Sequence, residues 1–124
     1  MELGKAGRYE EVIEVLGGLI EDYPNIPPAY NFLGSVYWKR GNLDGAIDCF
    51  QKAVKYAPSW ELASRALFHA LYERGQKDRA FAEVRRFLSI AESKEYLEIL
   101  NDLNAGLFRS PSHYLKISDD PSRN

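Results

Sequence analysis

A 34-residue internal repeat constrains the fold of this chain more than any other feature of its sequence. Three segments align without gaps at this spacing: 5–24, 39–58 and 73–92. Gly7, Gly41 and Gly75 fall 34 residues apart, and Pro24 and Pro58 share the same interval. Repeats of this length are typical of proteins that stack copies of one small helical or mixed unit.

Each unit carries two amphipathic helix patterns separated by a glycine. In the first pattern, over 28–40, the apolar side follows the spacing i, i+3, i+4, i+7: Tyr30, Leu33, Gly34 and Tyr37. The stretch 43–56 shows the same periodicity, and Gly41 between them predicts a left-handed helix stop. No strand-like alternation occurs in the sequence, so the unit is predicted to be helix, tight turn, helix.

The residues of this unit resemble the tetratricopeptide repeat, whose motif has 34 residues. The matching positions are Tyr30, Leu33, Gly34, Tyr37, Ala46, Phe50, Ala53 and Pro58. The resemblance implies an all-α fold in which helix pairs stack into a right-handed α-α superhelix. It further implies a short solenoid of about two and a half repeats, closed by a C-terminal capping helix.

Inside each pair, the resemblance implies that small residues let the two helices approach. Gly34 is expected to lie close to Ala46, with Tyr37 and Phe50 filling the space around them. In the third copy Phe68 stands where Gly34 stands in the second, so its helices are expected to be pushed apart or rotated.

The predicted organisation is one repeat domain over 1–107 and a flexible tail over 108–124. The domain divides into a partial repeat at about 1–26, repeats at 27–60 and 61–94, and a capping helix at 93–106 that starts at Ser93. The tail is rich in Ser, Pro and Asp, although Tyr114, Leu115 and Ile117 offer apolar side chains that can dock.

The partial first repeat is expected to end one helix near Ala6, turn at Gly7, and start another at about 9. The apolar side of the 9–22 helix then lacks half its cover. An uncovered apolar face invites association. The chain is therefore expected either to be a fragment of a longer array or to form a homo-oligomer through this repeat.

The family's first helices line a concave groove, and the resemblance implies that a peptide or partner protein binds there. By register, the groove-facing residues are Asn31, Ser35, Trp38, Lys39, Arg65, His69 and Tyr72. Aromatic side chains supply rigid contact area and the polar ones supply directed hydrogen bonds. The alternative for Trp38 and Tyr72 is packing against each other or an adjacent helix.

Two functional classes follow from the sequence. The first is a protein–protein interaction module, an adaptor or scaffold, that binds a peptide in the groove. The second is a structural subunit that self-associates through the partial repeat. An enzyme is not expected, because His69 and His113 stand far apart and no catalytic, cofactor or metal-binding motif is present.

Composition excludes several other classes. The net charge of −2 argues against nucleic-acid binding, and no apolar run is long enough for a membrane span. A single cysteine, Cys49, rules out an internal disulfide and fits a cytoplasmic location. Asp48 beside it is expected to raise the pKa of its thiol.

Overall fold

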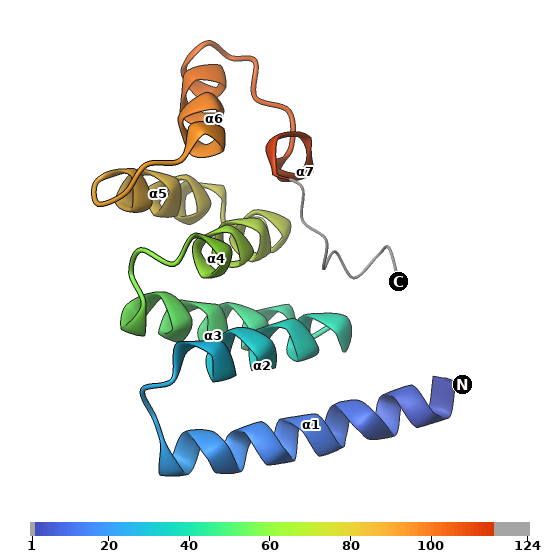
Figure 1. Cartoon of the computed structure of the whole chain (residues 1–124). Coiled ribbons are helices and arrows are strands. Elements are labelled where there is room, and N and C mark those ends of the chain that lie inside the picture. Colours follow the sequence, from blue (N-terminus) through green and yellow to red (C-terminus); the bar gives the residue numbers. More distant parts are fainter. Residues whose placement is uncertain (1, 116–124) are drawn as a thin grey trace. The chain divides into compact units, whose positions relative to one another are not determined.

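Every regular element in the described part of the chain is a helix, which confirms the all-α prediction. The computed structural model describes residues 2–115, and only the backbone of residues 2–7. The helices are α1 (Glu2–Asp22), α2 (Pro27–Lys39), α3 (Leu43–Tyr56), α4 (Glu61–Glu73), α5 (Lys77–Leu88), α6 (Lys94–Asn104) and α7 (Pro111–Tyr114) (Figure 1). The chain forms two compact units, Met1–Pro58 and Ser59–Asn124.

In the first unit, α2 and α3 form a hairpin, and they lie side by side in Figure 1. The predicted stop between them is confirmed: Gly41 has a φ of 84°, and its N–H donates to the Trp38 carbonyl at 2.8 Å. Asn42 then caps α3, since its side-chain oxygen accepts a hydrogen bond from the Gly45 N–H at 2.9 Å. These contacts turn the chain back within three residues.

The close approach predicted at Gly34 is confirmed, but its nearest neighbour is different. A Cβ placed on Gly34 would lie 2.6 Å from Cε1 and 2.7 Å from Cδ1 of Phe50. The ring of Phe50 therefore reaches into the space that the missing side chain leaves, and its carbons are the atoms nearest to that space. Phe50 is only 1% exposed, so this contact is at the centre of the hairpin.

The prediction of a helix, a turn at Gly7 and a second helix in the partial repeat is wrong. α1 is one continuous helix that runs through Gly7. A turn at such a glycine is favoured where the preceding helix folds back and packs along the next one, as α2 does on α3. Glycine costs a helix only about 1 kcal/mol relative to alanine, so α1 can continue through Gly7.

In the second unit, α4 and α5 form the corresponding hairpin, with Gly75 at a φ of 90° in the turn. Phe68, at the position of Gly34, is fully buried between the rings of Phe81 and Tyr96, at 5.8 and 6.0 Å. The facing position that Phe50 holds in α3 is the smaller Val84 in α5, also fully buried. The large residue is thus on the second helix in one hairpin, as Phe50 facing Gly34, and on the first helix in the other, as Phe68 facing Val84.

α6 follows the predicted capping helix closely. It starts after Ser93, whose hydroxyl accepts a hydrogen bond from the Tyr96 N–H at 3.2 Å, as the sequence predicts. Its inward side chains, Tyr96 and Ile99, are fully buried. α6 packs against α5 within the second unit.

The prediction of a flexible segment from residue 108 is wrong for residues 108–115. They form an irregular stretch and α7, which packs against α4 and α6. Tyr114 and Leu115 are buried, and the Tyr114 hydroxyl donates a hydrogen bond to Asp102 Oδ2 at 2.8 Å. The apolar side chains outweigh the Ser- and Pro-rich composition around them. Ile117 and the rest of 116–124 lie outside the described residues.

Candidate functional site

Four of the seven sequence-predicted contact residues lie on α2, in the first unit. Asn31, Ser35 and Trp38 are half-buried and Lys39 is exposed. Their spacing of four, three and one residues places them along one side of the helix. The structure therefore brings these four together as a mixed aromatic, amide and cationic surface.

Trp38 contributes to the packing of its own hairpin as well as to this surface. Its ring meets the ring of Phe50 edge-on, with centroids 6.1 Å apart and planes at 62°. Trp38 thus packs in part against the adjacent helix α3, as the alternative interpretation predicts. Asn31 differs, because its Oδ1 is buried and accepts no hydrogen bond from residues 2–115. Such an amide oxygen gains about 1–3 kcal/mol from finding a donor.

The other three predicted contact residues lie on α4, in the second unit, and are engaged inside it. Arg65 pairs with Glu61 on its own helix and with Glu95 of α6, where Nη2 and Oε1 are 3.1 Å apart. The Ser93 hydroxyl donates to Glu61 at 3.0 Å. Arg65 therefore joins α4 to the start of α6. Its positive charge is already neutralised by two carboxylates, so it offers little charge to a partner.

His69 and Tyr72 also face the interior of the second unit. His69 is buried, with Nε2 3.6 Å from Glu73 Oε2. Tyr72 is half-buried among the rings of Phe68, Phe81 and Phe108, and the Lys77 ammonium lies 5.2 Å from its centroid. The role of these residues in binding stays a prediction, and their surroundings are those of packing residues.

A buried polar network in the second unit was not anticipated from the sequence. The Ser64 hydroxyl donates to Glu83 Oε2 at 2.6 Å and is 2.9 Å from the Tyr96 hydroxyl, which donates to it. Arg86 donates two hydrogen bonds to the same carboxylate, and these hold the pKa of its guanidinium above the usual value. Burial raises the pKa of the Tyr96 phenol. The network ties α4, α5 and α6 together and presents no accessible reactive group.

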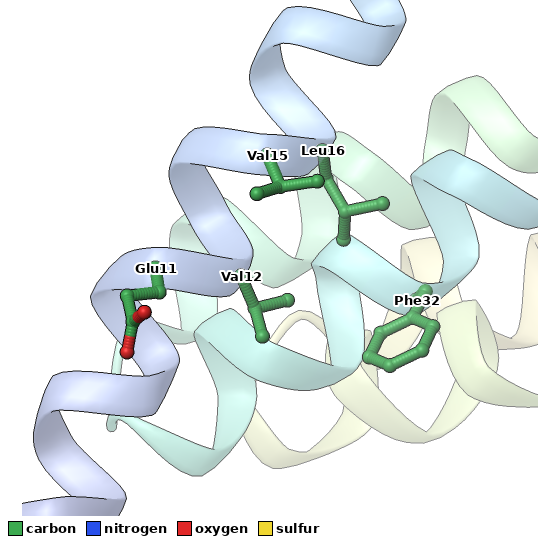
Figure 2. A pocket seen from close by; sticks show the side chains of 5 residues that line it. All are labelled: Glu11, Val12, Val15, Leu16 and Phe32. Carbon is green, nitrogen blue, oxygen red and sulfur yellow. The ribbon is translucent and has the colours of Figure 1, made fainter.

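An open apolar groove lies between α1 and α2 of the first unit. It has a volume of about 300 Å³ and is lined by Glu11, Val12, Val15, Leu16 and Phe32. Figure 2 shows the Val12 and Leu16 side chains projecting from α1 toward the Phe32 ring on α2, with Glu11 at the edge. Sequence reasoning missed Val15 and Phe32. The available signal was a large apolar residue just off the buried stripe of each amphipathic helix.

Reactive chemistry is not favoured by the groups that the structure describes. Burial in the first place, and then Asp48, raise the pKa of the Cys49 thiol to about 11, so the predicted direction is confirmed. Among residues 2–115 no cluster of three His, Cys, Asp or Glu side chains has the geometry to hold a metal ion. In the same range, none of the helices combines the length and apolarity that crossing a bilayer requires.

Comparison with known proteins agrees with this geometry. The sequence model of the tetratricopeptide repeat family matches residues 27–59, which contain the α2–α3 hairpin. The α2–α3 hairpin is therefore a tetratricopeptide repeat. It is 30% identical over 90 residues to the small glutamine-rich tetratricopeptide repeat-containing protein 2 of Mycosarcoma maydis. That alignment covers 73% of this chain and 26% of the relative, so the chain spans about a quarter of the relative's length.

The presence of this repeat indicates a general class of function. Tetratricopeptide repeats generally mediate protein–protein interactions, and the family is a non-catalytic repeat family. Its motif residues in this chain, such as Gly34, Ala46 and Phe50, are buried and hold the hairpin together. Recognition therefore depends on the surface residues around the motif, which differ from one repeat protein to another.

Proposed function

We propose that this chain is an adaptor or scaffold module, without enzymatic activity or cofactor, that binds a peptide segment of a partner protein on α2. The observation that carries the proposal is the surface of Asn31, Ser35, Trp38 and Lys39 on the hairpin that matches the family. The α4 residues Arg65, His69 and Tyr72 are expected to support the second unit first and to contact a partner only secondarily. We further propose that the protein is cytoplasmic, as its composition predicts.

The chemistry of the α2 surface suits a peptide backbone. The half-buried Asn31 amide can donate a hydrogen bond from its Nδ2 to a peptide carbonyl. Trp38 offers an aromatic edge already fixed by Phe50, so little side-chain entropy is lost when a partner contacts it. Lys39, at the exposed end of α2, favours an acidic residue or a C-terminal carboxylate in the partner.

A display experiment tests this proposal. Peptides selected from a random library on the wild-type protein are measured against the double variant Asn31→Ala/Lys39→Glu. We expect affinity to fall tenfold or more while the melting temperature does not fall, because no hydrogen bond or ion pair of either side chain within residues 2–115 supports the hairpin. Lys94→Glu, the same charge reversal at an exposed lysine on α6, is the matched control. Peptides that bind the wild type and the double variant equally would show that α2 is not the binding surface.

The second candidate function is a structural subunit that associates with copies of itself through α1. The half-buried apolar side of α1, including Val12, Leu16 and Leu19, favours an occupant on this helix. The charge of α1 argues against a second copy as that occupant, for the reason developed in the next subsection. Analytical ultracentrifugation over a concentration series separates the two candidates, since only self-association makes the mass rise with concentration.

A further inference from the structure

The apolar side of α1 has less cover than the same side of the two later helices in the repeat register. Val12, Leu16 and Leu19 are half-buried. The register equivalents are at most 1% exposed: Ala46, Phe50 and Ala53 in α3, and Ala80, Val84 and Phe87 in α5. The equivalent side of the helix is thus buried in the second and third repeats and only half-buried in the first.

Two flanking positions show the same difference more strongly. Val15 is 69% exposed, whereas its equivalents Cys49 and Glu83 are 8% and 7% exposed. Phe32 is 58% exposed, whereas its equivalent Ala66 is 8% exposed. Val15 and Phe32 both line the groove between α1 and α2. The open surface is therefore continuous across two helices of one unit rather than a scatter of single side chains.

The hairpin beside it shows what shape fits such a surface. The side of α3 that carries Phe50 is covered by a helix, α2, whose Gly34 makes room for the ring. At the matching position α1 has Leu16, which is shorter than Phe50. A helix lying on α1 thus needs no glycine there and can place a large apolar side chain in the groove instead.

The charge of α1 decides what kind of helix this is. The sequence of α1 has six acidic and two basic residues, a net charge of −4. Both basic residues, Lys5 and Arg8, precede the stretch 9–22, which holds five of the acidic ones: Glu10, Glu11, Glu14, Glu21 and Asp22. Glu10 is already paired with Arg40 at 2.7 Å, whereas Glu11, which lines the groove, is exposed. A second copy of α1 would bring like charges together, whereas a basic helix complements them.

We propose that the groove between α1 and α2 binds an amphipathic helix of a basic partner protein. The helix places large apolar side chains between Val12, Val15, Leu16 and Phe32, and one of its lysine or arginine residues faces Glu11. This surface is separate from Asn31, Ser35, Trp38 and Lys39, so the inference does not rest on the function proposed for them.

Two matched probes test the proposal by fluorescence anisotropy. Both are constrained synthetic helices of 14 residues, the length of α3, with leucines at i, i+3, i+4 and i+7. One carries lysines beside the leucine stripe and the other carries glutamates at the same positions. We expect the lysine helix to bind at least tenfold more tightly, with a difference that shrinks as salt is raised. Equal binding of the two helices would overturn the charge assignment.

Variants of exposed residues locate the binding without threatening the fold. Val15→Asn/Phe32→Ser is expected to weaken binding of the lysine helix at least tenfold, while Ile90→Asn, at an exposed apolar residue of the second unit, changes nothing. Glu11→Lys is expected to remove the preference for the lysine helix. Binding that survives Val15→Asn/Phe32→Ser overturns the location.

Two further measurements distinguish this proposal from its rivals. Asn31→Ala/Lys39→Glu should bind the lysine helix as the wild type does, because those residues do not line the groove. Loss of binding in that variant would place the helix on the α2 surface instead. A wild-type mass that doubles with concentration, and stays monomeric in Val15→Asn/Phe32→Ser, would make a second copy the occupant and refute the basic partner.

Discussion

Replacing Gly34 by alanine tests the central contact of the family-matching hairpin. Alanine gains about 1 kcal/mol of helix propensity over glycine. Its Cβ would lie 2.6 Å and 2.7 Å from two carbons of the Phe50 ring, about 1 Å inside an ordinary carbon–carbon contact. The ring cannot simply move aside, because it is 1% exposed and meets Trp38 edge-on.

The two effects have opposite signs, and the overpacking is the larger. Inserting a methyl group into a closed core costs typically 1–3 kcal/mol, and a clash with two ring carbons belongs in the upper half of that range. Gly34→Ala is therefore expected to lower the free energy of unfolding by about 1–2 kcal/mol. For a urea m-value of about 2 kcal/mol/M, the midpoint falls by roughly 0.5–1 M in denaturation followed by circular dichroism.

Gly17→Ala provides the matched control within the same unit. A Cβ on Gly17 meets no atom within 4 Å, so only the propensity gain remains. This variant is expected to raise the free energy of unfolding by about 0.5–1 kcal/mol. In a Phe50→Leu background the ring is gone, so Gly34→Ala is expected to become neutral or stabilising. If Gly34→Ala stabilises the wild type as Gly17→Ala does, the close packing of Gly34 on Phe50 is refuted.

Four further predictions concern other side chains that pack inside the two units. Ser64→Ala removes the donor to Glu83 and the acceptor of the Tyr96 hydroxyl, so it should lower the free energy of unfolding by about 1–3 kcal/mol, and by more than Tyr96→Phe, in the same urea titration. The Cys49 thiol has a pKa of about 11 against a reference of 9.0, so at pH 8 its thiolate fraction is about 100-fold lower than in urea-unfolded protein, and alkylation by iodoacetamide should slow by at least that factor. The raised pKa also means that Cys49 supports the fold fully below about pH 9 and that this contribution is lost as the pH rises toward 11, which a midpoint series over pH 8–11 will show. Trp38→Ala should weaken peptide binding and also lower stability by about 1 kcal/mol, and an unchanged denaturation midpoint would show that its ring does not support the hairpin.

The 34-residue register predicts the helix pairs well because it reports packing that repeats. α2, its stop at Gly41 and the start of α6 after Ser93 all follow from local signals that a single sequence contains. The same signal failed at Gly7, where α1 continues. A glycine permits a turn, but two helices must pack against each other to favour it.

Residues 108–115 show a second limit of sequence reasoning. Their Ser- and Pro-rich composition predicts flexibility, yet the Phe108 and Tyr114 rings stack with centroids 5.4 Å apart, and Tyr114 reaches Asp102. A few apolar residues decide whether a short segment docks, and composition averages over them. The surface against which they dock is formed by other parts of the chain, so the sequence of the segment alone does not predict it.

The candidate site was predicted by register, and register assumes that equivalent positions have equivalent neighbours. Trp38 and Tyr72 are equivalents, but Tyr72 lies among Phe68, Phe81 and Phe108, and two of these interactions depend on departures from the motif. Phe68 replaces the small residue that the hairpin of the second repeat needs, and Phe108 arrives from beyond α6. Because these rings pack around Tyr72 in the second unit, Tyr72 serves as a packing residue. Trp38, its equivalent on α2, keeps part of its surface exposed to solvent.

The same reasoning gives a mutational contrast between the two helices. Among the described residues, Asn31 and Lys39 make no hydrogen bond or ion pair that supports the first unit, so their replacement should change binding without lowering stability. Arg65 bridges two carboxylates across α4 and α6, so Arg65→Ala should lower stability whatever it does to binding. A repeat position is a binding residue only where its own copy leaves it free of packing, and in this chain α2 meets that condition better than α4.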